Sequence, residues 1–88
     1  MDITPFNIDY NYDDAVRQAE IRPCCREDNV VDYAVWQHDK LAFTITKDAL
    51  LGHWIIAMKN ADDFVDDSEV QQIGKGIEQN YATSHESR

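Results

Sequence analysis

Apolar and polar side chains alternate along the first part of the chain. Apolar residues occupy every second position from Phe6 to Tyr12, which is the period of a β-strand with one buried face. Residues 30–37 carry apolar groups on both faces, with Tyr33 on one side and Trp36 on the other. This second pattern is typical of an inner strand.

A short polar segment, HDK at 38–40, separates the inner strand from another alternating run. In residues 41–47, Leu41, Phe43 and Ile45 share one face by strict alternation. Two such runs joined by a few polar residues predict a β-hairpin.

Residues 13–21 fit two elements. The opening DDAVRQAE resembles the start of a capped helix, while the odd-numbered positions from 15 to 21 suit one face of a strand. We favour the strand and keep the helix as an alternative. Pro23 is expected to end either element, because proline pushes the residue before it out of helical geometry.

Residues 48–59 are equally ambiguous. Apolar residues fall on a helical stripe, but Trp54, Ile56 and Met58 also fall on one face of a strand. A glycine inside a short helix costs about 1 kcal/mol relative to alanine, so Gly52 favours a turn followed by a strand. A second helix at 48–59 is the competing interpretation.

The C-terminal segment 68–82 predicts a helix. At about 100° per residue, its apolar face carries Val70, Ile73, Gly74, Ile77 and Tyr81. Ser68 or Asp67 is the expected N-cap, with Gln71 as the capping-box partner of Ser68. Gly74 lies near the centre of the apolar face, which predicts a close approach of the helix backbone to the sheet.

These segments together predict an α+β fold: an antiparallel β-meander of about four to five strands with a C-terminal α-helix packed on one face. A chain of 88 residues is expected to form a single domain. We place that domain at 1–82 and predict a disordered polar tail at 83–88.

The charge balance excludes some classes of partner. The chain has 17 acidic and 8 basic residues, for a net charge of -9, which disfavours binding to nucleic acid and to anionic membranes. Neither a basic N-terminal region nor an apolar run of about 20 residues is present in the sequence. We therefore expect a cytoplasmic protein. An acidic nucleic-acid mimic, which would bind a DNA-binding protein, is one alternative function.

Acidic residues concentrate before the predicted helix, at Asp62, Asp63, Asp66, Asp67 and Glu69. They do not follow the ligand register of an EF-hand loop, so helix capping and solvation are the simplest explanation. The functional explanation is that the four aspartates, Asp62, Asp63, Asp66 and Asp67, contact a basic partner. Trp36 is a second candidate for partner binding, since it lies on the strand face opposite Tyr33.

Cys24 and Cys25 are adjacent. The flanking arginines would favour a thiolate, but the acidic residues that follow offset their field. Neighbouring Cα atoms are about 3.8 Å apart, less than the ~4.4 Å lower limit of ordinary disulfides. Both residues are expected to be free thiols at a strand end, with a thiol-dependent redox or metal-handling protein as the alternative.

Catalytic motifs are absent from the sequence. The histidines stand in separate segments, and the Gly-Lys-Gly at 74–76 lacks the spacing of a phosphate-binding loop. We predict a protein that is not an enzyme and needs no cofactor, namely a non-enzymatic protein-interaction or regulatory module. The expected partner is another protein, and a homo-oligomer is part of the same hypothesis.

Overall fold

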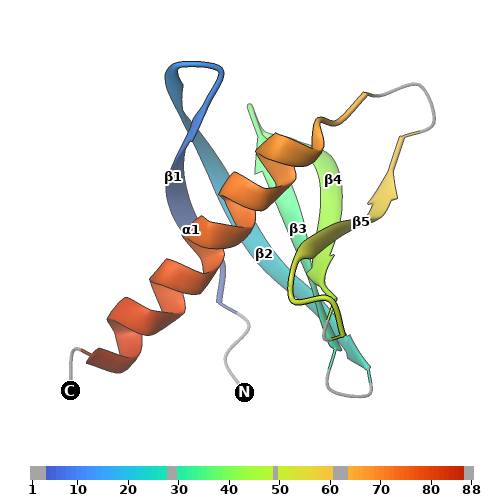
Figure 1. Cartoon of the computed structure of the whole chain (residues 1–88), viewed down its shortest axis with the longest axis vertical. Coiled ribbons are helices and arrows are strands. Elements are labelled where there is room, and N and C mark those ends of the chain that lie inside the picture. The colour runs from blue at the N-terminus through green and yellow to red at the C-terminus, as the bar shows by residue number, and fades with distance from the viewer. Residues whose placement is uncertain (1–3, 28–29, 49, 61–63, 87–88) are drawn as a thin grey trace.

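The computed structural model describes residues 4–27, 30–48, 50–60 and 64–86. Within these residues it contains one helix and five strands. They are β1 (Phe6–Tyr12), β2 (Ala15–Glu27), β3 (Val30–Gln37), β4 (Lys40–Lys47), β5 (Trp54–Lys59) and α1 (Asp67–Glu86). The strands form one sheet in the order β1-β2-β3-β4-β5, with every neighbouring pair antiparallel. Figure 1 shows α1 lying across one face of this sheet. The predicted α+β meander is therefore confirmed.

Two tight turns of the same kind set the first and third hairpins. Asp13 and Asp14 join β1 to β2, and His38 and Asp39 join β3 to β4; their φ angles are 55°, 60°, 54° and 62°. Two consecutive residues with positive φ form the turn whose twist matches that of the flanking strands. The turn at 38–39 was expected, whereas the helical alternative for 13–21 is wrong.

β2 does not end at Pro23. Pro23 pairs with Tyr33, the strand continues to Glu27, and the register shifts between Pro23 and Arg26. The prediction that proline ends the element fails because its fixed φ suits an extended chain. Its missing N–H is tolerated beside an irregularity in the ladder.

The described residues of the segment 48–59 form a turn at 50–51 and the strand β5, so the competing second helix is wrong. Gly52 has a φ of 74°, and its N–H donates to the Asp48 carbonyl at 2.8 Å. The Asp48 N–H donates to the His53 carbonyl at 2.8 Å. Glycine adopts this left-handed backbone at little cost, which brings the chain back into β5.

The core lies between α1 and the inner face of the sheet, which we define as the face that α1 covers. Val70, Ile73 and Ile77 of the helix are 0%, 0% and 1% exposed. The buried residues opposite them come from all five strands, and include Ile8, Ile21, Val35, Ile45 and Trp54.

Gly74 and Gly76 both allow this close packing. A Cβ at Gly74 would overlap the Trp54 indole, and a Cβ at Gly76 would come 2.9 Å from Cδ1 of Ile8. The close approach predicted for Gly74 is confirmed. The role of Gly76 could not be predicted, because its neighbour Ile8 is distant along the chain.

The N-cap of α1 lies one residue before Asp67, the earlier of its two expected positions. Oδ1 of Asp66 accepts a hydrogen bond from the Ser68 N–H at 3.0 Å, and the Asp66 carbonyl accepts one from the Val70 N–H at 3.1 Å. Asp66 is therefore the N-cap, in place of Ser68 or Asp67. In a run of three capping residues, sequence preference does not select which one leaves the helical geometry. At its other end α1 reaches Glu86, beyond the predicted end at 82.

The expected capping-box partner has another role. The Gln71 side chain accepts a hydrogen bond from the Trp54 N–H at 3.1 Å and donates one to the Trp54 carbonyl at 2.6 Å. Both backbone groups lie on the edge of β5 that faces away from β4, so Gln71 covers that edge as a strand neighbour would.

The structure was also searched for a membrane-spanning helix. Among the described residues, no helix is long and apolar enough to cross a membrane.

Candidate functional site

The face of the sheet opposite α1, here called the outer face, has no layer over it among the described residues. On β3, β4 and β5 its cross-strand neighbours are Ala34 beside Thr44, Thr44 beside Met58, and Trp36 beside Leu41. Ile55 lies next to them, since it pairs with Thr46. We call this set the apolar half-face: Ala34, Trp36, Leu41, Thr44, Ile55 and Met58.

Two register shifts bring Leu41 and Met58 to this face. By strict alternation Leu41 would share the face of Phe43, and Met58 that of Ile56. The shift between Val35 and Trp36 places Leu41 opposite Trp36, and the shift between Thr44 and Ile45 places Met58 opposite Thr44. As a result Leu41 is 46% exposed and Met58 is 68% exposed. The faces expected for these two residues were therefore wrong.

The other half of the outer face is polar. The outward positions on β1 and on the first part of β2 are Asn7, Asp9, Asn11, Gln18 and Glu20, together with the apolar Val16 opposite Asn11. They alternate with the buried Ile8, Tyr10 and Ala19. The outer face is thus divided into a polar, acidic half on β1–β2 and the apolar half-face on β3–β5.

Trp36 lies at the border between the two halves. The Arg22 guanidinium carbon is 4.0 Å from the centroid of the Trp36 ring, and Arg22 also pairs with Glu20 at 2.9 Å. This cation–π contact holds the ring in place. Trp36 lies on the face opposite Tyr33, as the sequence indicated, and its role in partner binding stays a prediction.

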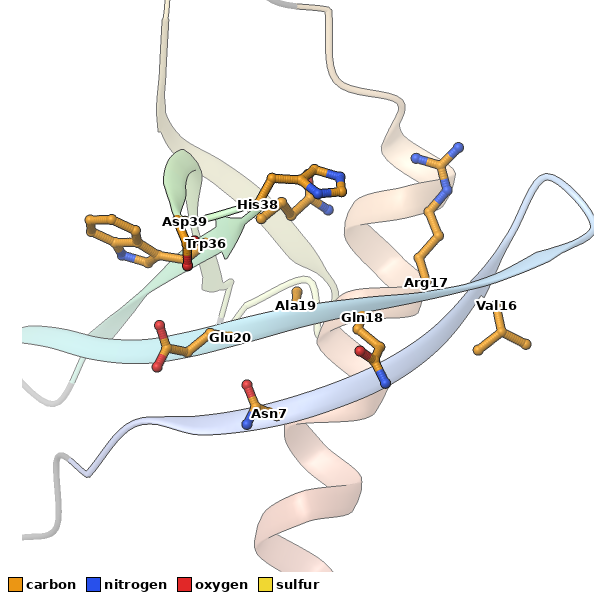
Figure 2. Close-up of a pocket in the computed structure, with 10 residues that line it drawn as sticks. Asn7, Val16, Arg17, Gln18, Ala19, Glu20, Trp36, His38 and Asp39 are labelled. Atoms are coloured by element: carbon orange, nitrogen blue, oxygen red, sulfur yellow. The ribbon is translucent and has the colours of Figure 1, made fainter.

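A groove of about 860 Å³ adjoins this border on the side of the first hairpin. Its walls come from the first half of β2 and from the end of β3 with the turn that follows it. Figure 2 shows Val16, Gln18 and Glu20 along β2, with Trp36, His38 and Asp39 on the other side. This groove could not be predicted from the sequence, because it depends on where β3 stops alongside β2.

The acidic segment is described only in part, since Asp62 and Asp63 lie outside the described residues. Asp66 caps α1 and accepts a hydrogen bond from the Tyr12 hydroxyl at 2.8 Å. The Tyr12 hydroxyl and then the Ser68 N–H hold the pKa of the Asp66 carboxyl below its usual value. Asp67 is exposed. The contacts of Asp66 stabilise the fold, and partner binding by the four aspartates stays a prediction.

A second set of polar contacts fastens the start of α1 to the sheet. The Tyr10 hydroxyl donates to Oε2 of Glu69 at 2.7 Å and accepts a hydrogen bond from the Gln37 amide at 2.6 Å. Arg17 lies 3.9 Å from the same Glu69 oxygen. Burial raises the pKa of Tyr10, with Glu69 adding to the effect. Each polar group here satisfies another, which is the arrangement of a structural network.

A smaller hollow of about 360 Å³ lies between the second half of α1 and the sheet. Tyr33, Trp54 and Tyr81 line it, and Tyr33 packs edge-on against Trp54 with ring centroids 5.5 Å apart. At its rim, Glu78 accepts hydrogen bonds from Lys47 at 2.7 Å and from the Trp54 indole N–H at 3.1 Å. Burial raises the pKa of Tyr33 to about 12. The polar groups at this rim are paired with one another.

The alternative thiol and metal functions gain no support from the geometry. Cys24 and Cys25 lie in β2, but their side chains are outside the described part of the structure. Over the residues that are described, no group of three or more histidine, cysteine, aspartate or glutamate side chains is placed to hold a metal ion.

Comparison of the chain with protein-family models, with curated proteins and with solved structures gave no match in any of the three.

Proposed function

We propose that this protein is a non-enzymatic protein-interaction module, and that the apolar half-face is its binding surface. The observation that carries the proposal is the uneven cover of the sheet. α1 buries the inner face, while Trp36, Leu41, Ile55 and Met58 gather on the outer face within three neighbouring strands. Contiguous exposed apolar surface is typical of protein-interaction sites.

The residue types at this surface suit a protein partner. Trp and Arg are enriched among the residues that dominate binding energy at interfaces, and here Arg22 stacks on Trp36 at 4.0 Å. The flexible Met58 side chain can adapt to an irregular partner surface. The ring of Trp36 is already ordered by its contact with Arg22, so less conformational entropy is lost on binding.

The net charge of the chain, -9, favours a partner with an apolar centre and a basic surface around it. Close to the half-face both signs occur: Asp32 lies on β3 and Asp39 in the turn after it, but Glu20 is paired with Arg22, and Lys40 precedes Leu41. Complementary charge at the rim mainly accelerates association and makes it sensitive to salt. A second copy fits less well, because two chains of this charge repel each other. We expect this partner in the cytoplasm.

A pair of double variants tests the surface. Leu41→Ser with Met58→Ser removes apolar area from the half-face. Leu50→Ser with Leu51→Ser removes area outside the half-face, in the turn before β5, where the side chains are 96% and 67% exposed. Each tagged form is used to capture proteins from a cell lysate. We identify and purify the proteins that bind the wild type and the turn variant but not the half-face variant, and titrate them calorimetrically against all three forms.

The proposal predicts a purified partner whose affinity falls at least about tenfold, or ~1.4 kcal/mol, in the half-face variant and stays unchanged in the turn variant. Raising the salt concentration should slow association. Equal affinity for both variants would overturn the proposal. So would sedimentation showing that the half-face is occupied by a second copy of the chain.

A further inference from the structure

The first part of β2 extends beyond the end of its neighbour β3. It pairs with β1 from Ala15 onward but with β3 only from Glu20 onward. Over residues 15–19, β2 therefore has a strand neighbour on one edge and none on the other among the described residues. The groove of about 860 Å³ lies along this stretch.

The hairpin geometry identifies the backbone groups on the open edge. A two-residue turn closes on a hydrogen-bonded pair, and here that pair is Tyr12 and Ala15. Bonded and non-bonded pairs alternate along an antiparallel ladder, so Ala15, Arg17 and Ala19 bond to β1. The N–H and C=O groups of Val16 and Gln18 then point away from β1, toward the groove.

This edge lacks the protection that the sheet has elsewhere. Gln71 covers the outer edge of β5 by bonding both backbone groups of Trp54. Along the open stretch of β2, Val16 is an exposed apolar residue at 71%, and Arg17 lies 5.1 Å from the Tyr12 ring and near Glu69. Proteins commonly blunt exposed edges with proline or outward charge, and neither feature stands at Val16 or Gln18.

We propose that the open edge of β2 binds a short extended peptide as an added antiparallel strand. The stretch of five residues is about 16 Å long at ~3.3 Å per residue. The backbone groups of Val16 and Gln18 offer it two donors and two acceptors. Strand addition of this kind obtains its affinity from main-chain hydrogen bonds and its specificity from alternate side chains.

The turn after β3 sets the orientation and chemistry of the peptide. A strand antiparallel to β2 runs in the direction of β3, so its N-terminal end lies nearest His38 and Asp39. There the Asp39 carboxylate favours an ammonium group or a basic side chain, while Glu20 is already paired with Arg22. The first peptide residue pairs with Gln18 and the third with Val16. The side chain of the third residue therefore lies beside Val16 on the outer face, which favours an apolar residue.

The inference concerns a different surface from the apolar half-face, and it is tested separately. Bead-bound pentapeptides, randomised at all five positions and with free N-termini, are selected on the wild-type protein. Binding to Gln18→Pro and Gln18→Ala is then compared. Proline removes the N–H at the open edge while leaving the bonds of Arg17 and Ala19 to β1 intact, whereas alanine keeps that N–H.

Selected peptides should carry a basic residue at the first position or an apolar one at the third. They should bind Gln18→Ala within about twofold of the wild type and Gln18→Pro at least about fivefold more weakly, because one main-chain hydrogen bond is lost and the proline ring takes the place of the donor. Failure to select any peptide, or equal binding to both variants, would overturn the inference.

N-methylated peptides keep the test valid if Gln18→Pro does not fold, because they use the unaltered protein. Methylation at the third amide, which faces β2, should abolish binding, while methylation at the second, which faces away, should not. In the free protein the amides of Val16 and Gln18 should exchange with deuterium faster than those of Arg17 and Ala19. Slow exchange at Val16 and Gln18, or equal effects of the two methylations, would contradict strand addition. Neither result bears on the variants of Leu41 and Met58.

Discussion

Gly74 is the residue at which α1 approaches β5 most closely, since the Trp54 indole fills the space that a Cβ would take. Trp54 is buried and is held by hydrogen bonds from its backbone to Gln71 and from its indole to Glu78. The ring cannot move aside without breaking these contacts.

Gly74→Ala should therefore lower the free energy of unfolding by about 2 kcal/mol, the usual cost of overpacking a core. Gly76→Ala is the matched control. Its Cβ meets the flexible end of Ile8, and the gain in helix propensity of up to about 1 kcal/mol offsets the contact. Urea unfolding of both variants measures the difference. Equal stability of the Gly74 variant and the wild type would contradict the packing of α1 on Trp54.

The turn residues carry backbone strain that a glycine would remove. Asp14 has a φ of 60° at the second position of its turn, where glycine is strongly preferred. We expect Asp14→Gly to raise the free energy of unfolding by about 0.5 kcal/mol, since part of the gain is lost to the greater freedom of the unfolded chain. Asp9→Gly, in the middle of β1, should destabilise instead. Thermal melts of the two variants should shift in opposite directions, and a lower melting temperature for Asp14→Gly would argue against the turn geometry.

At the scale of elements, the start of α1 is fastened to the first hairpin by side chains from both. The Tyr12 hydroxyl bonds to Asp66 at 2.8 Å and the Tyr10 hydroxyl to Glu69 at 2.7 Å. These two contacts join segments that are 54 and 59 residues apart in the chain, so the first turn of the helix depends on the hairpin.

This connection predicts a pH dependence. The pKa of Asp66 is lowered in the folded protein, so its contribution to stability is present above the unfolded value of 3.8 and is lost as the pH falls through the folded pKa. Tyr12→Phe removes the main cause and should raise the pKa of Asp66. A carboxyl-detected NMR titration of the wild type and the variant measures this shift. An unchanged Asp66 pKa in Tyr12→Phe would show that the hydroxyl does not stabilise the carboxylate.

Much of the fold could be predicted from the sequence, because the strands of this protein follow a period of two and its helix a period of 3.6. The errors arose where one residue type serves several structures. Aspartate suits both a helix cap and a left-handed turn, so Asp13 and Asp14 were compatible with either. Pro23 fits an extended strand as well as it ends a helix.

The candidate site was much harder to predict than the fold. Trp36 could be recognised from alternation alone. Leu41 and Met58 join it on the outer face only because the register shifts once in each of two strand pairs, and a shift of one residue moves a side chain to the opposite face. Pattern analysis assumes a constant register, so it placed Leu41 on the face of Phe43 and Met58 on the face of Ile56.

At the scale of the whole molecule, the described residues form one helix, which covers only one face of the five-stranded sheet. The inner face forms the core, and the outer face divides into an acidic half and the apolar half-face. A net charge of -9 opposes self-association through this face and favours association with a basic partner. The open edge of β2, which adjoins it, is the second surface for which we propose binding.

The measurement that tests the apolar half-face most directly is a methyl NMR spectrum of the protein, labelled at isoleucine, leucine, methionine and valine methyls, with and without its purified partner. We predict that the largest changes in chemical shift occur at Leu41, Ile55 and Met58. The methyls of Leu50 and Leu51 should remain unchanged. Largest changes at Leu50 and Leu51, with Leu41, Ile55 and Met58 unaffected, would contradict the assignment of the half-face as the binding surface.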